Sequence, residues 1–216
     1  MSGDERVARG MKSQLGERRR ALARDDRGLG WKLGFGTPAA MEKLGIDAPL
    51  VGYLLASARL ESGAVVDISN WENPRLEPEI VVRVGEDGGI AAIGAAIELI
   101  DLDPGEGDPE AILAVDIFQR RVLIGPVTEG AGLDDVRLQL LVGGEEVAAT
   151  DDITAATGEL DGLVRHVATT LEAAGESLER GDMVICGSIV PALEIAPGDD
   201  VEVRLEPLGS LAVSFA

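Results

Sequence analysis

The feature that most limits the fold of this 216-residue chain is a succession of short apolar segments separated by turns. From residue 73 onward, runs of strand length alternate with clusters of glycine, proline and aspartate. The expected strands cover residues 77–84, 90–100, 121–125, 136–150 with a reversal at 143–144, 183–190, 201–205 and 211–215. One helix is expected among them, over 158–174, because apolar residues recur there at helical spacing. Many short strands and few helices predict an α+β fold, a β-rich mixed sandwich or roll with helices to one side.

The first third of the chain has a different pattern. Residues 4–24 are expected to form an amphipathic helix, and a second helix is expected from Thr37, as cap, and Pro38 to Gly45. Residues 30–36 are too rich in glycine for a helix and too apolar for a free loop, so a short strand is expected. The chain thus divides into an N-terminal helical or cap segment, residues 1–67, and a β-roll domain, residues 68–216, within one structural unit.

The charge and the hydropathy pattern exclude several kinds of partner. The net charge of −20 repels nucleic acid and anionic lipid. The longest apolar stretch, residues 90–97, is far shorter than the roughly 20 residues of a membrane-spanning helix. The N-terminus has charged residues and no apolar signal core, so a cytoplasmic protein is expected. An anionic substrate would also be repelled, and a local positive charge must therefore receive it.

Residue counts leave few kinds of catalytic site. The single cysteine, Cys186, stands in an apolar run that predicts a buried strand, and it cannot form an internal disulfide. The only histidine, His166, falls on the helix over 158–174 as a surface or boundary residue. A zinc site of histidines and cysteines and a serine–histidine–aspartate triad are therefore poorly supported, and phosphate-loop and dinucleotide patterns are absent from the sequence.

Glu77 and Glu79 are two residues apart in an expected strand, so their side chains leave the same face and can converge. The alternative is a solvated strand face that also holds Arg83, since glutamate is usually exposed. Pro78, between the glutamates, is tolerated at a strand start, an edge or a bulge, which favours a functional kink.

Glu98 is the more informative carboxylate, because residues 91–100 are otherwise uncharged. A buried, unpaired carboxylate would cost several kcal/mol, so Glu98 should be protonated, paired or bound to a metal ion. An ion pair with a nearby arginine is the simpler alternative. If Glu98 meets Glu77 and Glu79, a hard divalent cation is the natural way to neutralise the three carboxylates.

Lys32 is one of three lysines and stands among tryptophan, leucine, phenylalanine and glycines. If desolvated there, it would have a lowered pKa and could move a proton or hold a carboxylate. The alternative is a side chain that reaches out to solvent along an apolar surface.

Taken in order, these segments resemble the 2-keto-4-pentenoate hydratase pattern of the fumarylacetoacetate hydrolase superfamily. The resemblance covers residues 29–215 and rests on residues 30–34, 44–47, 52–54, 73–80, 96–100, 187–188, 196–199 and 207–211. It implies a β-roll of the superfamily's C-terminal type, Mg²⁺ or Mn²⁺ on Glu77, Glu79 and Glu98, and a small anionic 2-oxo acid chelated to the ion. It also implies Lys32 as the proton-handling residue, a substrate-binding set of Lys32, Gly34, Thr37 and Ser188, and a homodimer or larger homo-oligomer.

Three segments depart from that pattern, and one of them, the link between Glu79 and Glu98, is shorter than in the family. Hydratases of the family carry an acidic residue just before the Gly-Tyr-Leu element, where this chain has Leu50, and a small polar stretch is replaced by residues 114–120. The resemblance implies a metal-dependent lyase, a hydratase of small unsaturated 2-oxo acids. A 2-oxo-3-enedioate decarboxylase, an acylpyruvate hydrolase and a non-catalytic ligand-binding or assembly protein are the alternatives.

Overall fold

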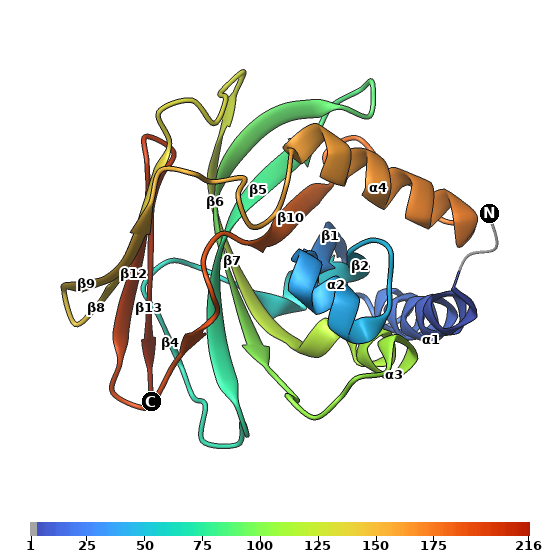
Figure 1. Cartoon of the computed structure of the whole chain (residues 1–216), viewed down its shortest axis with the longest axis horizontal. Coiled ribbons are helices and arrows are strands. Elements are labelled where there is room, and N and C mark those ends of the chain that lie inside the picture. The colour runs from blue at the N-terminus through green and yellow to red at the C-terminus, as the bar shows by residue number, and fades with distance from the viewer. Residues whose placement is uncertain (1–3) are drawn as a thin grey trace.

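The computed structural model describes residues 4–216, which form two β-sheets and a group of helices (Figure 1). The α-helices are α1 (Glu5–Leu22), α2 (Pro38–Leu44), α3 (Pro109–Ala114) and α4 (Leu160–Ala173), with 3-10 turns η1 (Ala56–Ala58) and η2 (Asp116–Phe118). The larger sheet has the order β2-β1-β10-β5-β6-β7-β3, with β11 paired to β5, and the smaller has the order β4-β13-β12-β8-β9. The predicted α+β fold, rich in strands with flanking helices, is confirmed.

The strands of the larger sheet are β1 (Gly28–Gly34), β2 (Leu50–Leu55), β3 (Arg59–Leu60), β5 (Pro74–Val84), β6 (Ile90–Asp101), β7 (Gln119–Glu129), β10 (Met183–Ser188) and β11 (Leu193–Glu194). Those of the smaller sheet are β4 (Ala64–Val66), β8 (Arg137–Val142), β9 (Glu145–Thr150), β12 (Asp200–Glu206) and β13 (Gly209–Phe215). Every strand and helix expected from the sequence is present within a few residues. The expectation of a single helix after residue 73 is wrong, because α3 is a second one, with Asp108 as cap and Pro109 in its first turn.

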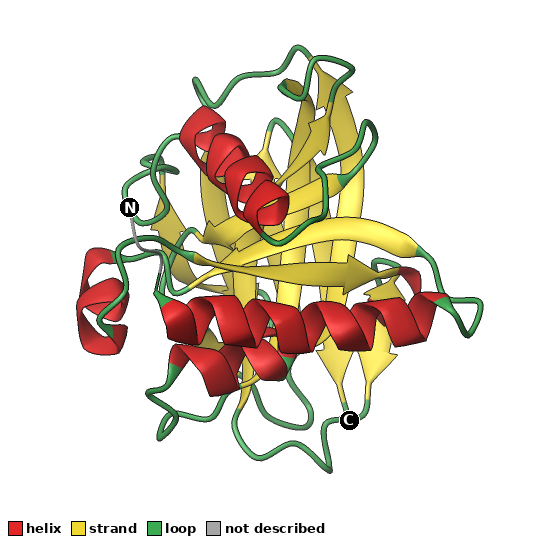
Figure 2. Cartoon of the chain, turned by 90° about the vertical axis from the view of Figure 1, so that its right-hand side faces the viewer, coloured by secondary structure: helices red, strands yellow, loops and turns green. Residues whose placement is uncertain are grey.

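The two sheets pack through a continuous apolar core, to which α1, α2 and α4 also contribute. In Figure 1 the smaller sheet lies on one side of the larger sheet and the helices lie on the other. Figure 2 shows α4 crossing the strands obliquely above the long α1. None of the described helices is long and apolar enough to cross a membrane.

Strand β1, which carries Lys32, can pair closely with β10 because of a glycine. Gly30 has φ +147, and a Cβ there would stand 1.8 Å from the Met183 carbonyl oxygen. This close approach lets β1 run parallel to β10, with Lys32 opposite Ile185. Strands of residues 1–67 thus pair with strands of 68–216, and the proposed division at 67 remains a prediction.

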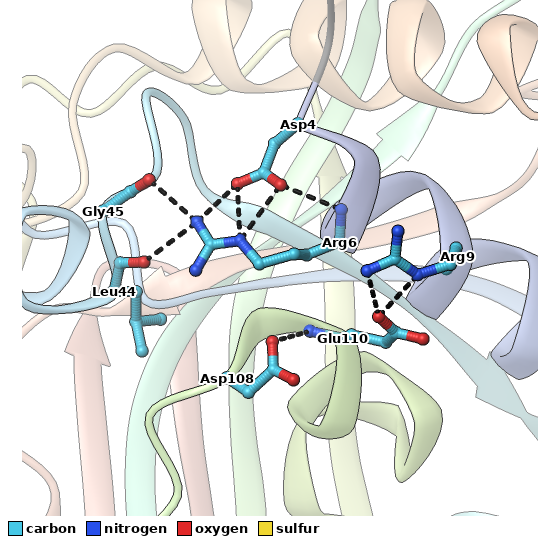
Figure 3. A network of polar contacts seen from close by, with 7 residues as sticks. All are labelled: Asp4, Arg6, Arg9, Leu44, Gly45, Asp108 and Glu110. Atoms are coloured by element: carbon cyan, nitrogen blue, oxygen red, sulfur yellow. Dashed lines mark hydrogen bonds and ion pairs between the residues drawn. The ribbon is translucent and has the colours of Figure 1, made fainter.

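Polar contacts tie α1 to the two short helices that lie beside it (Figure 3). Arg6 is paired with Asp4 at 2.6 Å, and its guanidinium also donates to the carbonyl oxygen of Gly45 just after α2, at 3.2 Å. Arg9 pairs with Glu110 of α3 at 2.6 Å. Surface pairs of this kind contribute little individually, so these contacts mainly fix how α2 and α3 sit beside α1.

Candidate metal centre

The three glutamates predicted as ligands lie together because of the register between β5 and β6. Glu77 stands directly opposite Glu98 in this antiparallel pair, and Glu79 follows Glu77 on the same face. One carboxylate oxygen from each residue lies within 4.8 Å of those of the other two. Glu79 has no exposed surface, so the alternative of a solvated strand face is wrong.

Lys32 reaches this cluster from β1. Its side chain is 1 % exposed and its ammonium forms an ion pair with Glu98 Oε1. The ammonium also donates a hydrogen bond to the Ile117 carbonyl oxygen at 3.3 Å. The alternatives of a lysine extended into solvent and of an arginine partner for Glu98 are therefore both wrong.

Burial and mutual repulsion make these carboxylates reluctant to ionise together. Burial raises the pKa of Glu77 to about 7, with the Glu98 charge adding to the effect. The pKa of Glu79 is raised well above its usual value by burial and by the other two glutamates. Burial also raises the pKa of Glu98, although Lys32 opposes it. For Lys32, burial lowers the pKa, but Glu98 and Asp116 outweigh it and the pKa rises, contrary to the lowered value considered from sequence.

The donor set fits a hard divalent cation. Glu79 Oε2 accepts a hydrogen bond from the Gly187 amide at 2.7 Å, whereas its Oε1 is buried and accepts none from the described residues. An orphaned buried carboxylate oxygen is costly unless a cation or a proton satisfies it. Three carboxylates without a histidine or thiolate ligand are typical of Mg²⁺, Mn²⁺ or Ca²⁺ sites.

A cavity of about 220 Å³ opens beside the cluster. Glu77, Glu98 and Lys32 line it, and so do all three further residues predicted to bind substrate, Gly34, Thr37 and Ser188. The remaining wall is largely apolar and comes from β1, β6, η2, α4 and the residues that directly follow β1 and β6. Its larger side chains are those of Leu33, Phe35, Ile100, Leu102, Ile117, Phe118 and Leu163.

Sequence reasoning missed the part played by η2. Asp116, Ile117 and Phe118 have φ values of 52°, 54° and 63°, a left-handed run without glycine. This backbone brings the Ile117 carbonyl oxygen to Lys32 and directs Phe118 edge-on to Phe35, with ring centroids 6.4 Å apart. The only available signal was the departure of residues 114–120 from the family pattern, which does not specify a left-handed turn.

Comparison with known proteins gives a consistent picture. No family model matches the chain. A 4-oxalocrotonate decarboxylase of Pseudomonas putida is 30% identical, and the match covers 92% of this chain and 81% of the relative. A 2-keto-4-pentenoate hydratase of Dechloromonas aromatica is 25% identical over 90% of this chain and 80% of its own. The solved structure of the 4-oxalocrotonate decarboxylase from Pseudomonas putida G7, complexed with magnesium and adipate, superposes with a TM-score of 0.82 at 26% identity, covering 94% of this chain and 83% of that one.

Similarity of this extent in both sequence and fold identifies the relationship predicted from the sequence motifs. The chain belongs to the 2-keto-4-pentenoate hydratase and fumarylacetoacetate hydrolase superfamily and is an enzyme.

Proposed function

We propose that the protein is a divalent-metal-dependent lyase that decarboxylates a small unsaturated 2-oxo dicarboxylic acid, a 2-oxo-3-enedioate. Glu77, Glu79 and Glu98 hold the ion, with Mg²⁺ or Mn²⁺ as the expected metal. The observation that carries the proposal is the cluster of three carboxylates and one buried lysine beside a largely apolar cavity. Relatives named as decarboxylases and hydratases support the same reaction classes.

The substrate's oxo-acid end fits the polar end of the cavity. A cation on the three carboxylates would supply the Lewis acid that stabilises enolate charge at the 2-oxo group. Lys32 is the only cationic side chain that lines the cavity within residues 4–216. It would receive the substrate's carboxylate there, despite the net charge of −20, and hold a proton close to the developing enolate oxygen.

The apolar part of the cavity wall favours loss of carbon dioxide over addition of water. In decarboxylation, the bond to the distal carboxylate breaks and its electron pair passes along the conjugated chain to the 2-oxo oxygen, which Lys32 can protonate. Apolar lining residues such as Phe118 and Leu102 would solvate that carboxylate poorly and so assist its loss. No base is needed for this step.

Hydration instead needs a base that takes a proton from water near the distal carbon. Among the described lining residues, the titratable ones are Glu77, Glu98 and Lys32 of the cluster, and Cys186. Burial raises the pKa of the Cys186 thiol, which therefore stays protonated at neutral pH. Hydration is the second candidate, favoured by the hydratases among the relatives.

Thermal unfolding of chelator-treated protein tests the proposal. We expect Mg²⁺ or Mn²⁺ to raise the melting temperature and oxalate, a mimic of the oxo-acid end, to enlarge the shift. A metal at about 100 times its Kd would stabilise by roughly 2.7 kcal/mol, or about 5–10 °C for a chain of this size. Two turnover assays would then separate the reactions. Release of carbon dioxide from a 2-oxo-3-enedioate would show decarboxylation, and consumption of a 2-oxo-4-enoate would show hydration. Absence of a shift with either metal would contradict the metal site.

The metal response should depend on pH in a defined direction. The folded-state pKa of Glu77 is raised by burial to about 7, and burial raises the pKa of Glu79 well above its usual value of 4.5 as well. Because these pKa values are raised, the metal-free protein should lose stability as pH rises from 5 through 7. Metal binding must displace the protons, so the metal-dependent shift should grow over the same interval.

Melting temperatures at pH 5 to 8, with chelator and with Mg²⁺, check this. Repulsion among the other acidic groups also lowers stability as pH rises. The pH dependence of the metal-free Glu79→Gln variant gives this general effect, and the difference from wild type gives the contribution of the cluster. A metal-dependent shift that is independent of pH would show that the carboxylates are ionised without the metal.

A further inference from the structure

Asp116 is a buried carboxylate next to the proposed metal centre that the proposed reaction does not use. It is 9 % exposed and lies in the left-handed turn η2. Its Oδ1 accepts a hydrogen bond from the Tyr53 amide of β2 at 2.9 Å. Within residues 4–216 no other hydrogen bond to this carboxylate is present, so most of its accepting capacity is left to the open hollow that it lines with Tyr53 and to any nearby positive charge.

The nearby positive charge is that of Lys32, which lies across Gly52, the residue that stands opposite it in β2. A Cβ on Gly52 would lie 2.7 Å from Asp116 Oδ1 and 2.8 Å from Lys32 Cγ. The absent side chain therefore brings the carboxylate and the lysine stem together. The next residue of the turn, Ile117, accepts the hydrogen bond from the ammonium. The turn therefore contacts Lys32 through its backbone, and the charge of Asp116 attracts the ammonium without forming an ion pair.

A cation on the three glutamates would change which negative charges balance the Lys32 ammonium. Without one, Glu98 is its direct ion-pair partner. With one, Glu98 would share its charge with the cation, and the buried Lys32 would lose part of its compensation. Burial raises the pKa of Asp116 to about 8 while Lys32 opposes the rise, so added positive charge would favour its ionised form.

We infer that Asp116 is a positioning residue, the countercharge that keeps Lys32 in place when a divalent cation occupies Glu77, Glu79 and Glu98. The inference rests on the proposed function, because it requires that cation. It also links two of the departures from the family pattern. An acidic residue is missing at Leu50, and one from the altered segment 114–120 lies beside the same strand β2.

The test measures the Kd of Mn²⁺ by titration calorimetry for wild type, Asp116→Asn, Lys32→Met and the double variant. Asparagine keeps an oxygen that can accept from Tyr53 and is well tolerated at positive φ, so the fold should persist. We expect Asp116→Asn to weaken Mn²⁺ binding at least about tenfold in the wild-type background. In the Lys32→Met background, adding Asp116→Asn should alter the Kd of Mn²⁺ less than about twofold, because no lysine then needs a countercharge.

Turnover should show the same role as a fall in kcat larger than any rise in KM. The matched control is Asp182→Asn, since Asp182 accepts a hydrogen bond from Trp31, the neighbour of Lys32, at 3.0 Å. It should leave the Mn²⁺ Kd unchanged. An Asp116→Asn protein with wild-type affinity, or one equally weakened in both backgrounds, would overturn the inference while leaving the metal site intact. Failure of wild type to bind Mn²⁺ would instead overturn the proposed function and the inference together.

Discussion

Glu79→Gln is expected to abolish the metal-dependent rise in melting temperature while leaving the metal-free protein at least as stable as wild type. Glu79 is fully buried, and the two neighbouring glutamates and burial itself oppose its charge. Glutamine has nearly the same shape, and its carbonyl oxygen can still accept from Gly187, the partner of Glu79 Oε2. The substitution thus removes a ligand and a source of repulsion at once. Turnover should fall about 1000-fold, since metal stabilisation of the enolate contributes several kcal/mol.

Glu98→Gln should differ in a diagnostic way. It removes the same metal response, but it also deprives the buried Lys32 of its ion-pair partner. Breaking one side of a buried pair costs about 3 kcal/mol or more, so the metal-free variant should melt lower than Glu79→Gln.

Glu129→Gln is the matched control for both substitutions. Glu129 is 81 % exposed at the end of β7 and pairs with Arg83 at the surface. Its loss should change stability by less than about 1 kcal/mol and leave the metal shift intact. A Glu79→Gln protein that retained the full shift would exclude Glu79 as a ligand, and calorimetry with Mg²⁺ would verify this independently of melting.

The glutamate cluster could be predicted because its geometry is local. Side chains two residues apart on a strand leave the same face of the sheet, and this does not depend on the rest of the fold. Glu98 stood out because residues 91–100 are otherwise uncharged. The helix cap could also be predicted. The Thr37 hydroxyl oxygen accepts a hydrogen bond from the Ala40 amide at 3.2 Å, as expected from a threonine that precedes Pro38.

Contacts between distant segments could not be predicted. The partner of Glu98 is 66 positions away in sequence and reaches it only because β1 pairs with β10 and β10 with β5. Strand β2 went unnoticed, although its residues 52–54 carried part of the resemblance, because a short apolar run with a glycine is ambiguous between strand and loop.

The left-handed turn at Ile117 was beyond prediction for a different reason. A β-branched residue at φ 54° opposes its own local preference, and only contacts with the rest of the fold, such as the hydrogen bond from Lys32, hold it there. Sequence patterns report local preference, and they fail where tertiary contacts override it.

Lys32→Met is expected to separate proton handling from metal binding. Methionine fills much of the buried volume of the lysine but carries no proton and no charge. Loss of a positioned proton donor should lower kcat about 100- to 10,000-fold. The metal-free protein should be destabilised by roughly 3 kcal/mol, because Glu98 then faces the other glutamates without its cation partner.

Bound metal should reverse that loss of stability. A divalent cation neutralises the carboxylates that Lys32 no longer serves, and the charge repulsion between lysine and metal is gone, so the metal-dependent rise in melting temperature should exceed that of wild type. Melting curves with chelator and with Mg²⁺, together with turnover at saturating metal, measure both effects. Lys43→Met, on the exposed surface of α2, serves as the control and should change neither. Wild-type turnover in Lys32→Met would show that the lysine takes no part in the reaction. Lost turnover together with a larger metal-dependent rise in melting temperature is expected for a lysine that competes with the metal for Glu98.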